Sequence, residues 1–174
     1  LIWVYAVLDN EHWHVIVYNF DGEMLFIFNN MGLQKGQLRN PTSIAWLGDK
    51  LIVTDKYYKN ISVFSPTEFG KNVLKANEEY FFGNWNASHE SWLKVLELNA
   101  NYDIAYVGIG KKYLMEKDYK NAVDYFRLGN NRIYYSDAYR GYRNELLKEN
   151  FAIVMGVIVI VLSYIIYTEI KYVK

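Results

Sequence analysis

Residues 151–167 read FAIVMGVIVIVLSYIIY and carry no charged side chain. Charged residues bracket the run on both sides: Lys148, Glu149, Glu169, Lys171 and Lys174. Extended to Thr168, the run has about 18 residues, which is near the lower limit for a helix that crosses a hydrocarbon core of about 30 Å. The sequence therefore predicts a transmembrane helix over residues 151–168, followed by a short cytoplasmic tail, residues 169–174.

Two small residues interrupt this apolar run. Gly156 and Ser163 are seven residues apart, or two helical turns, so both lie on one face of the predicted helix. Small residues let the backbones of two membrane helices approach closely. We therefore expect Gly156 and Ser163 to form an interface with a partner helix.

Aromatic residues and alanines recur at helical spacing in residues 67–150, a stretch without proline. One set matches the spacing of the tetratricopeptide repeat: Tyr106, Ile109, Gly110, Tyr113, Ala122, Phe126 and Gly129. A weaker copy lies one 34-residue period earlier, at Ala76, Ser88 and Trp92. The sequence predicts tetratricopeptide-like helical hairpins over residues 67–150, ending in a capping helix at residues 132–148.

Close packing of two helices explains why these residue types recur. Gly110 and Ala122 are small enough to let two helices approach each other. Tyr106, Tyr113 and Phe126 are the aromatic side chains expected to fill the groove between them. These five residues are the candidate packing residues of the helical hairpins.

Residues 1–66 contain short runs rich in Val, Ile, Tyr, Trp and Phe, separated by turn dipeptides, a pattern typical of antiparallel strands. Asp9 recurs as Asp55, at an offset of 46 residues, and a period of this length is typical of a propeller blade. Residues 32–45 resemble the loop that opens a blade in NHL repeats. We expect residues 1–66 to be the C-terminal part of an NHL-like β-propeller, with the other blades upstream.

The predicted fold class is thus multidomain α+β: partial NHL-like propeller blades, then tetratricopeptide-like α-hairpins, then a single transmembrane helix. This order resembles a family of Gram-positive bacterial membrane proteins, in which a propeller and tetratricopeptide ectodomain precedes a Yip-type multi-pass membrane domain. The resemblance implies a plasma-membrane protein with most of the chain outside the cell. It also implies an accessory role beside a carbohydrate ABC transporter.

Composition excludes some functions. Lys and Arg number 19 and Asp and Glu number 19, whereas a protein that neutralises nucleic-acid phosphates needs a cationic excess. The chain has no cysteine, so thiol nucleophiles, zinc–thiolate sites and iron–sulfur clusters are absent. We expect no nucleic-acid partner.

Histidines and aspartates give no complete catalytic or metal-binding motif. His12 and His14 have the spacing of half a metal site on a strand, but no second pair of ligands lies nearby in the sequence. Asp9 and Asp55 recur at one period, which favours a structural role in which each carboxylate fixes a turn by accepting backbone N–H bonds. We expect no catalytic residue, metal site or cofactor.

Three aromatic residues in predicted loops are candidate contacts for a ligand or partner: Trp13, Tyr57 and Tyr58. Aromatic faces stack on sugar rings, so a glycan is one candidate ligand, although most strand aromatics pack in cores. The leading hypothesis is a non-enzymatic, membrane-anchored scaffold or interaction protein, whose partners are the lipid bilayer and a membrane or cell-surface protein such as a transporter permease. The alternatives are a propeller-type metal-dependent lactonase or hydrolase with its site mostly upstream, and an integral subunit of a transporter.

Overall fold

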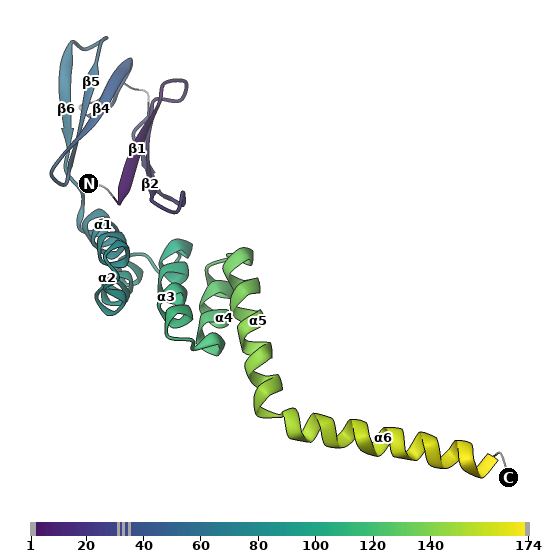
Figure 1. The fold of residues 1–174 in the computed structure, drawn as a ribbon. Helices are drawn as coiled ribbons and strands as arrows, with labels where there is room; N and C mark the ends of the chain where they lie inside the picture. Colours follow the sequence, from purple (N-terminus) through teal and green to yellow (C-terminus); the bar gives the residue numbers. More distant parts are fainter. Residues whose placement is uncertain (1–2, 31, 33, 35, 173–174) are drawn as a thin grey trace.

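The computed structural model describes residues 3–30, 32, 34 and 36–172, and in that part of the chain two three-stranded antiparallel sheets precede six helices (Figure 1). The first sheet has the order β1 (Val4–Asp9), β2 (His14–Asn19) and β3 (Met24–Phe28). The second has the order β4 (Pro41–Leu47), β5 (Lys50–Asp55) and β6 (Asn60–Phe64). The helices are α1 (Glu68–Phe81), α2 (Trp85–Leu98), α3 (Asp103–Met115), α4 (Tyr119–Leu128), α5 (Arg132–Glu149) and α6 (Phe151–Tyr172).

Alternating burial fixes the register of the central strand in each sheet. Val15 and Val17 of β2 are fully buried, and Leu51 and Val53 of β5 are buried in the same alternating way. Each sheet therefore turns one apolar face toward the core. The β4–β5 hairpin closes through Gly48, whose φ of 61° lies in the left-handed region that glycine adopts without strain.

Two aspartates fix the turns that follow β1 and β5, as the sequence predicted. The carboxylate of Asp55, only 2% exposed, accepts four backbone hydrogen bonds. The donors are the N–H groups of Arg39, Asn40, Tyr57 and Tyr58, at 2.7, 3.1, 2.8 and 3.1 Å. Burial alone would raise the pKa of Asp55, but these donors stabilise the charged form and hold the pKa below its ordinary value. Asp9 accepts N–H bonds from Glu11 and His12 in the same way.

The prediction of NHL-like propeller blades is wrong. Each sheet has three strands rather than the four of a blade. The offset of 46 residues aligns β1 and β2 with β5 and β6, which hold different places in their sheets, and it aligns β3 with part of α1. The sequence period therefore reflects a repeated hairpin with an aspartate-held turn, not a repeated blade.

The prediction of repeated tetratricopeptide hairpins is also wrong. From α1 to α5 the helices have 14, 14, 13, 10 and 18 residues, so the described chain repeats no hairpin of constant size. Ala76 and Trp92 belong to the core shared with the sheets, whereas Ala122 and Phe126 belong to a second cluster. The spacing in the sequence reflects close packing of neighbouring helices, which any helical stack requires.

One apolar core joins both sheets to the first three helices. It includes Val17 of the first sheet, Val53 of the second, Val73 of α1, Trp92 of α2 and Ile109 of α3. The second, smaller cluster lies between α3, α4 and α5. We call this packed part, comprising both sheets and α1–α5, the head.

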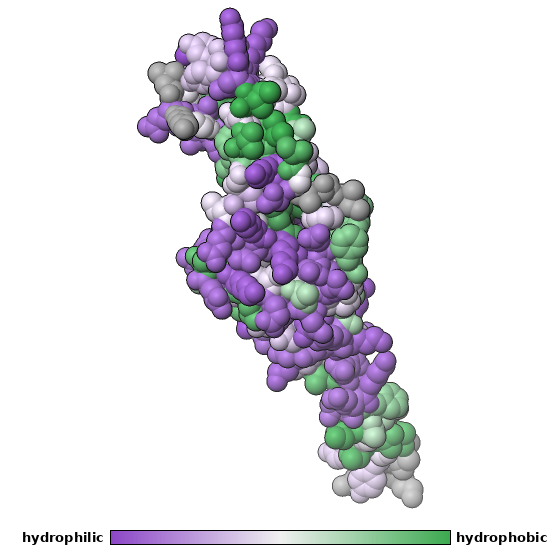
Figure 2. Space-filling model, turned by 90° about the vertical axis from the view of Figure 1, so that its left-hand side faces the viewer, coloured by the Kyte–Doolittle hydropathy of each residue, from purple (hydrophilic) through white to green (hydrophobic). Residues whose placement is uncertain are grey.

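Helix α6 leaves the head and extends away from it (Figure 1). Its main tertiary contacts are made with α5, and its large apolar side chains from Phe151 to Tyr167 are exposed. Figure 2 shows hydrophilic side chains over the helical part of the head and hydrophobic ones at the end formed by α6. The head therefore buries a core of apolar side chains, whereas α6 leaves its apolar side chains exposed.

Candidate functional site

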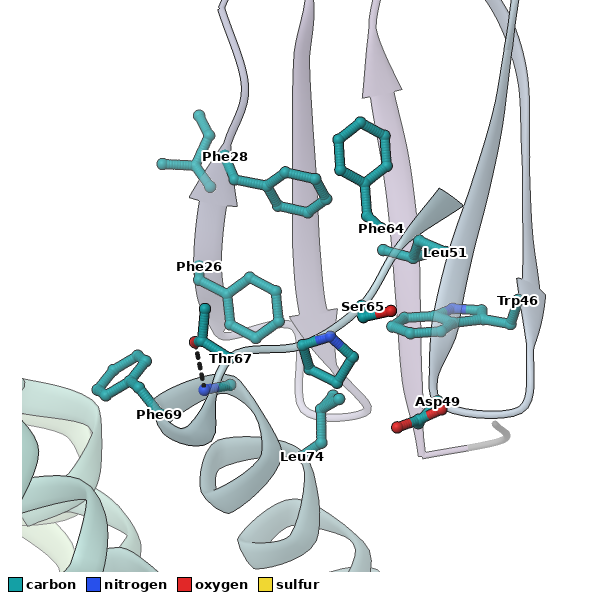
Figure 3. A pocket seen from close by; sticks show the side chains of 13 residues that line it. Phe26, Phe28, Trp46, Asp49, Leu51, Phe64, Ser65, Thr67, Phe69 and Leu74 are labelled. Atoms are coloured by element: carbon teal, nitrogen blue, oxygen red, sulfur yellow. Dashed lines mark hydrogen bonds between the residues drawn. The ribbon is translucent and has the colours of Figure 1, made fainter. Parts of the chain in front are cut away.

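A cavity of about 380 Å³ opens between the two sheets and the start of α1 (Figure 3). Its walls are mainly aromatic and aliphatic, and include Phe26, Phe28, Trp46, Leu51, Phe64 and Leu74. Phe28 of β3 and Phe64 of β6 meet edge to face, with ring centroids 5.2 Å apart, and so join the two sheets beside the cavity. Size and lining are typical of a pocket for an apolar ligand or side chain.

Few polar groups reach this cavity. The hydroxyl of Thr67 caps α1 by accepting the N–H of Gly70 at 3.2 Å, so it is already used. The indole Nε1 of Trp46 is buried and has no hydrogen-bond partner among the described residues. A buried donor without a partner is unfavourable. The cavity therefore offers mainly apolar contacts, and the polar side chains that line it are Asp49, Ser65 and Thr67.

A second polar cluster, which sequence reasoning missed, links the first sheet to α3. The ammonium of Lys111 lies 2.7 Å from Asp21 Oδ2 and 3.0 Å from Glu23 Oε2, and its side chain is 5% exposed. The rings of Tyr80 and Tyr134 lie 5.0 and 4.9 Å from the same nitrogen. We call Lys111, Asp21 and Glu23 the lysine clamp.

Two carboxylates hold the Lys111 ammonium in its charged form. Burial alone would lower the pKa of Lys111, but the charge of Glu23 and the hydrogen bonds to Asp21 and Glu23 raise it above its ordinary range. The clamp therefore holds the β2–β3 turn against α3. Its signal in the sequence is a lysine that directly follows the apolar run AYVGIG of residues 105–110.

The three predicted contact residues lie outside the cavity. Trp13 sits in the β1–β2 turn with a φ of 57°. Tyr57 is 53% exposed and is covered on one face by the Arg39 guanidinium, 3.9 Å from the ring centroid. The hydroxyl of Tyr58 donates to the carbonyl of Gly32 at 2.6 Å, which ties this tyrosine to the loop before β4. Tyr57 and Tyr58 meet edge to face, and their role as ligand contacts stays a prediction.

The five predicted packing residues cluster around the α3–α4 pair. A Cβ on Gly110 would lie 2.7 Å from the ring of Phe126, and both Phe126 and Ala122 are fully buried. Tyr113 stacks on Tyr125, with centroids 5.3 Å apart. The hydroxyl of Tyr106 donates to the carbonyl of Ala100 at 2.9 Å.

The two predicted interface residues of α6 face open space. A Cβ added to Gly156 meets no atom within 4 Å, and the hydroxyl of Ser163 donates to the carbonyl of Val159, one turn earlier, at 2.8 Å. This back-bonding satisfies the hydroxyl inside the helix. Both positions are thus available to a partner helix, and that use stays a prediction.

The described residues contain no group of three or more His, Cys, Asp or Glu side chains placed to hold a metal ion. His12 Nδ1 lies 2.9 Å from Asp9 Oδ2, and His14 Nε2 lies 2.9 Å from Asn30 Oδ1. The two imidazoles stack with centroids 6.1 Å apart. Each histidine therefore has a local partner of its own.

Comparison with protein-family models, with curated proteins and with solved structures gave no match to this chain. The resemblance to the Gram-positive membrane protein family therefore stays a prediction from sequence motifs. The functional argument depends on the geometry of α6, the cavity and the surface of the head.

Proposed function

We propose that the chain is a non-enzymatic, membrane-anchored interaction protein. In this proposal α6 holds the protein in the bilayer, and the head binds a membrane or cell-surface partner. The observation that carries the proposal is the exposed apolar surface of α6.

Helix α6 has the length and composition of a membrane span. Within the described chain it is the one helix that is long and apolar enough to cross a membrane, over the 18 residues Phe151–Thr168. None of this stretch is buried, whereas the core helix of a soluble protein is mostly buried. It also follows 150 other residues, unlike a signal sequence. Burial of each Val, Ile or Leu side chain is favourable by about 1.5–3 kcal/mol, and a bilayer supplies that burial.

Membrane fractionation of the full chain tests this anchor. We expect the protein to stay in the membrane pellet after an alkaline carbonate wash and to be released by detergent. A variant carrying Val157→Arg and Ile160→Arg places two charges at the centre of the span, at about 2.5–3.5 kcal/mol each. We expect this variant to leave the pellet. Ile61→Arg, at a 65% exposed position of β6, is the matched control and is expected to stay.

The placement of the head outside the cell is supported by the family resemblance, which also suggests a carbohydrate transporter as the neighbouring complex. Protease added to intact cells tests the placement. Digestion of the head in intact cells supports an extracytoplasmic head, and digestion only after lysis contradicts it.

A second candidate function, an integral subunit of a transporter, is favoured by Gly156 and Ser163. Both occupy one face of α6, and the space beside Gly156 is open. Gly156→Leu and Ser163→Leu would block close approach of a second helix there. We expect these two substitutions to abolish co-purification with a permease in mild detergent, whereas a protein bound only by the head would remain associated.

The cavity between the sheets is the proposed recognition site of the head for an apolar group of the partner. Leu74→Trp places a larger side chain in the cavity wall and is expected to reduce binding of an apolar fluorescent probe. Leu93→Trp on α2, at a 36% exposed position outside the cavity, is the matched control. Equal probe binding by both variants would contradict the assignment.

A further inference from the structure

The outer face of α5 has no partner within the described chain. α5 packs on α4 through Tyr134, which stacks on Phe126 at 5.3 Å, and through the buried Ala138. At Gly141 the contact is so close that a Cβ would lie 2.5 Å from the ring of Tyr119. Residues 134, 138 and 141 therefore define the packed face, and the opposite face is left to the surroundings.

That opposite face carries basic and apolar side chains together. Residues at spacings of four, four, three and four form one exposed stripe: Arg132, Ser136, Arg140, Arg143 and Leu147. Ile133 lies beside its first turn and is 77% exposed, and Leu147 is 51% exposed. We call Arg132, Ile133, Ser136, Arg140, Arg143 and Leu147 the outer stripe of α5.

The acidic residues of α5 lie off the outer stripe, so the stripe contains three arginines and no carboxylate. Glu145 and Glu149 are on the side of the packed face, and Asp137 is on the flank, where it pairs with Arg140. Basic residues mixed with exposed Ile and Leu are typical of helices that lie in the interface of a membrane containing anionic lipid.

The position of α6 brings this stripe toward the membrane. α6 starts directly after Asn150, the C-cap of α5, and runs off to the side of α5 opposite α4 (Figure 1). A bilayer crossed by α6 therefore lies on the side to which the outer stripe points. The stripe ends at Leu147, one turn before the span begins.

We propose that the outer stripe of α5 lies on the membrane surface, with its three arginines at anionic lipid phosphates and Ile133 and Leu147 in the headgroup region. This inference rests on the proposed membrane anchor. It adds that the head is held against the bilayer along α5, rather than hanging from a free joint at Asn150.

Depth measurement on the full chain tests this placement. The chain has no cysteine, so Ile133→Cys can carry a single environment-sensitive fluorophore. Residue 133 is 17 residues from Asn150, about 25 Å along a helix, so proximity to the span alone does not bring it to the lipid. Lys94→Cys on α2, an exposed position, is the matched control, and Val159→Cys reports on the span.

In vesicles of phosphatidylcholine and phosphatidylglycerol, we expect lipid-borne nitroxides to quench the labels at 133 and 159, and aqueous iodide to quench the label at 94. Combined Arg132→Gln, Arg140→Gln and Arg143→Gln substitutions should lower the docked-to-undocked ratio by about fivefold per arginine. Arg127→Gln on α4, where the side chain is 70% exposed, should leave it unchanged.

Four results would overturn the inference. If iodide quenches the label at 133 while lipid quenches the label at 159, the anchor stands and α5 faces water. If the label at 133 is shielded from both quenchers, protein and not lipid covers the outer stripe. If the glutamine variant docks as well as the parent, the arginines do not contribute to docking and apolar contact alone holds α5 at the membrane. If iodide quenches the label at 159, the anchor itself fails, and both proposals fall.

Discussion

Helices α3 and α6 are both apolar along most of their length, yet they meet opposite surroundings. α3 is buried in the head and includes a lysine that is 5% exposed at its side chain, because Asp21 and Glu23 neutralise it. α6 carries no charge over residues 151–167 and buries none of its span in protein. The contrast teaches that apolarity alone does not place a helix. In α3 the buried charge has carboxylate partners from the β2–β3 turn, which is compatible with a protein core. The exposed apolar side chains of α6 have no such protein surroundings and favour lipid.

The largest change in the free energy of unfolding is expected from substitution of Lys111, the buried charge that distinguishes α3 from α6. Lys111→Ala leaves Asp21 and Glu23 facing a buried space without a counter-charge, and loss of one partner of a buried pair costs about 3–5 kcal/mol. Because Asp21 and Glu23 are 34% and 22% exposed, we expect the lower end of that range. Urea unfolding of the full chain in detergent micelles measures the change.

Lys112→Ala is the control for the clamp, one position along the same helix. Lys112 pairs with Glu116 at 2.9 Å near the surface, and such pairs contribute about 0–1 kcal/mol. Equal losses in the Lys111 and Lys112 variants would show that the clamp is not special, and would weaken the distinction between α3 and α6.

A smaller effect is expected from adding one methyl group to each helix. Gly108→Ala in α3 places a Cβ 2.1 Å from the indole nitrogen of Trp92, and overpacking of this kind costs about 1–3 kcal/mol. Gly156→Ala in α6 meets no atom within 4 Å, and alanine favours helix by about 0.5–1 kcal/mol. The two variants should therefore shift stability in opposite directions. Destabilisation by both would mean that α6 is packed against something at Gly156.

Removal of the N-cap of α1 is expected to lower the free energy of unfolding by about 1 kcal/mol. Thr67→Ala removes the side-chain acceptor of the Gly70 N–H, and loss of such a cap costs about 0.5–2 kcal/mol. Thr67→Ser keeps the acceptor and is the matched control. The urea midpoint should fall for alanine only, because the cap supports the helix at the edge of the cavity.

The gentlest perturbation of the clamp is alkaline pH. The pKa of Lys111 is raised in the folded protein, so the clamp contributes fully below the ordinary lysine pKa and is lost as the pH rises toward the folded pKa. Between pH 7 and pH 11 the expected loss is about 1 kcal/mol. Lys111→Met removes this titration, so the parent should lose more stability than the variant across that interval. Parallel pH profiles would contradict the charged clamp.

Local features of the fold were predictable from the sequence, while its overall arrangement was not. Hairpin turns held by Asp9 and Asp55 followed from recurrence and side-chain chemistry, because each carboxylate accepts N–H bonds from the residues two and three positions later. The period of 46 residues did not distinguish a repeated hairpin from a blade, because strand order depends on contacts far apart in the chain. The helix spacing around Gly110 and Phe126 likewise reports local packing and not a repeat.

The candidate site shows the same limit. The cavity is built by side chains from β3, β4, β5, β6 and α1, which no local pattern brings together. The predicted contacts Trp13, Tyr57 and Tyr58 lie in turns between strands, outside the cavity. The lysine clamp joins residues about 90 positions apart, so its carboxylates carried no signal near Lys111 in the sequence.

The most direct test of the account is the reactivity of a single cysteine at the centre of α6. Val159→Cys in vesicles is treated with a membrane-impermeant maleimide, with Lys94→Cys on the head as the reference. We expect position 94 to react and position 159 to remain unmodified until detergent dissolves the bilayer. Equal modification of both positions in intact vesicles would contradict the claim that α6 spans the membrane.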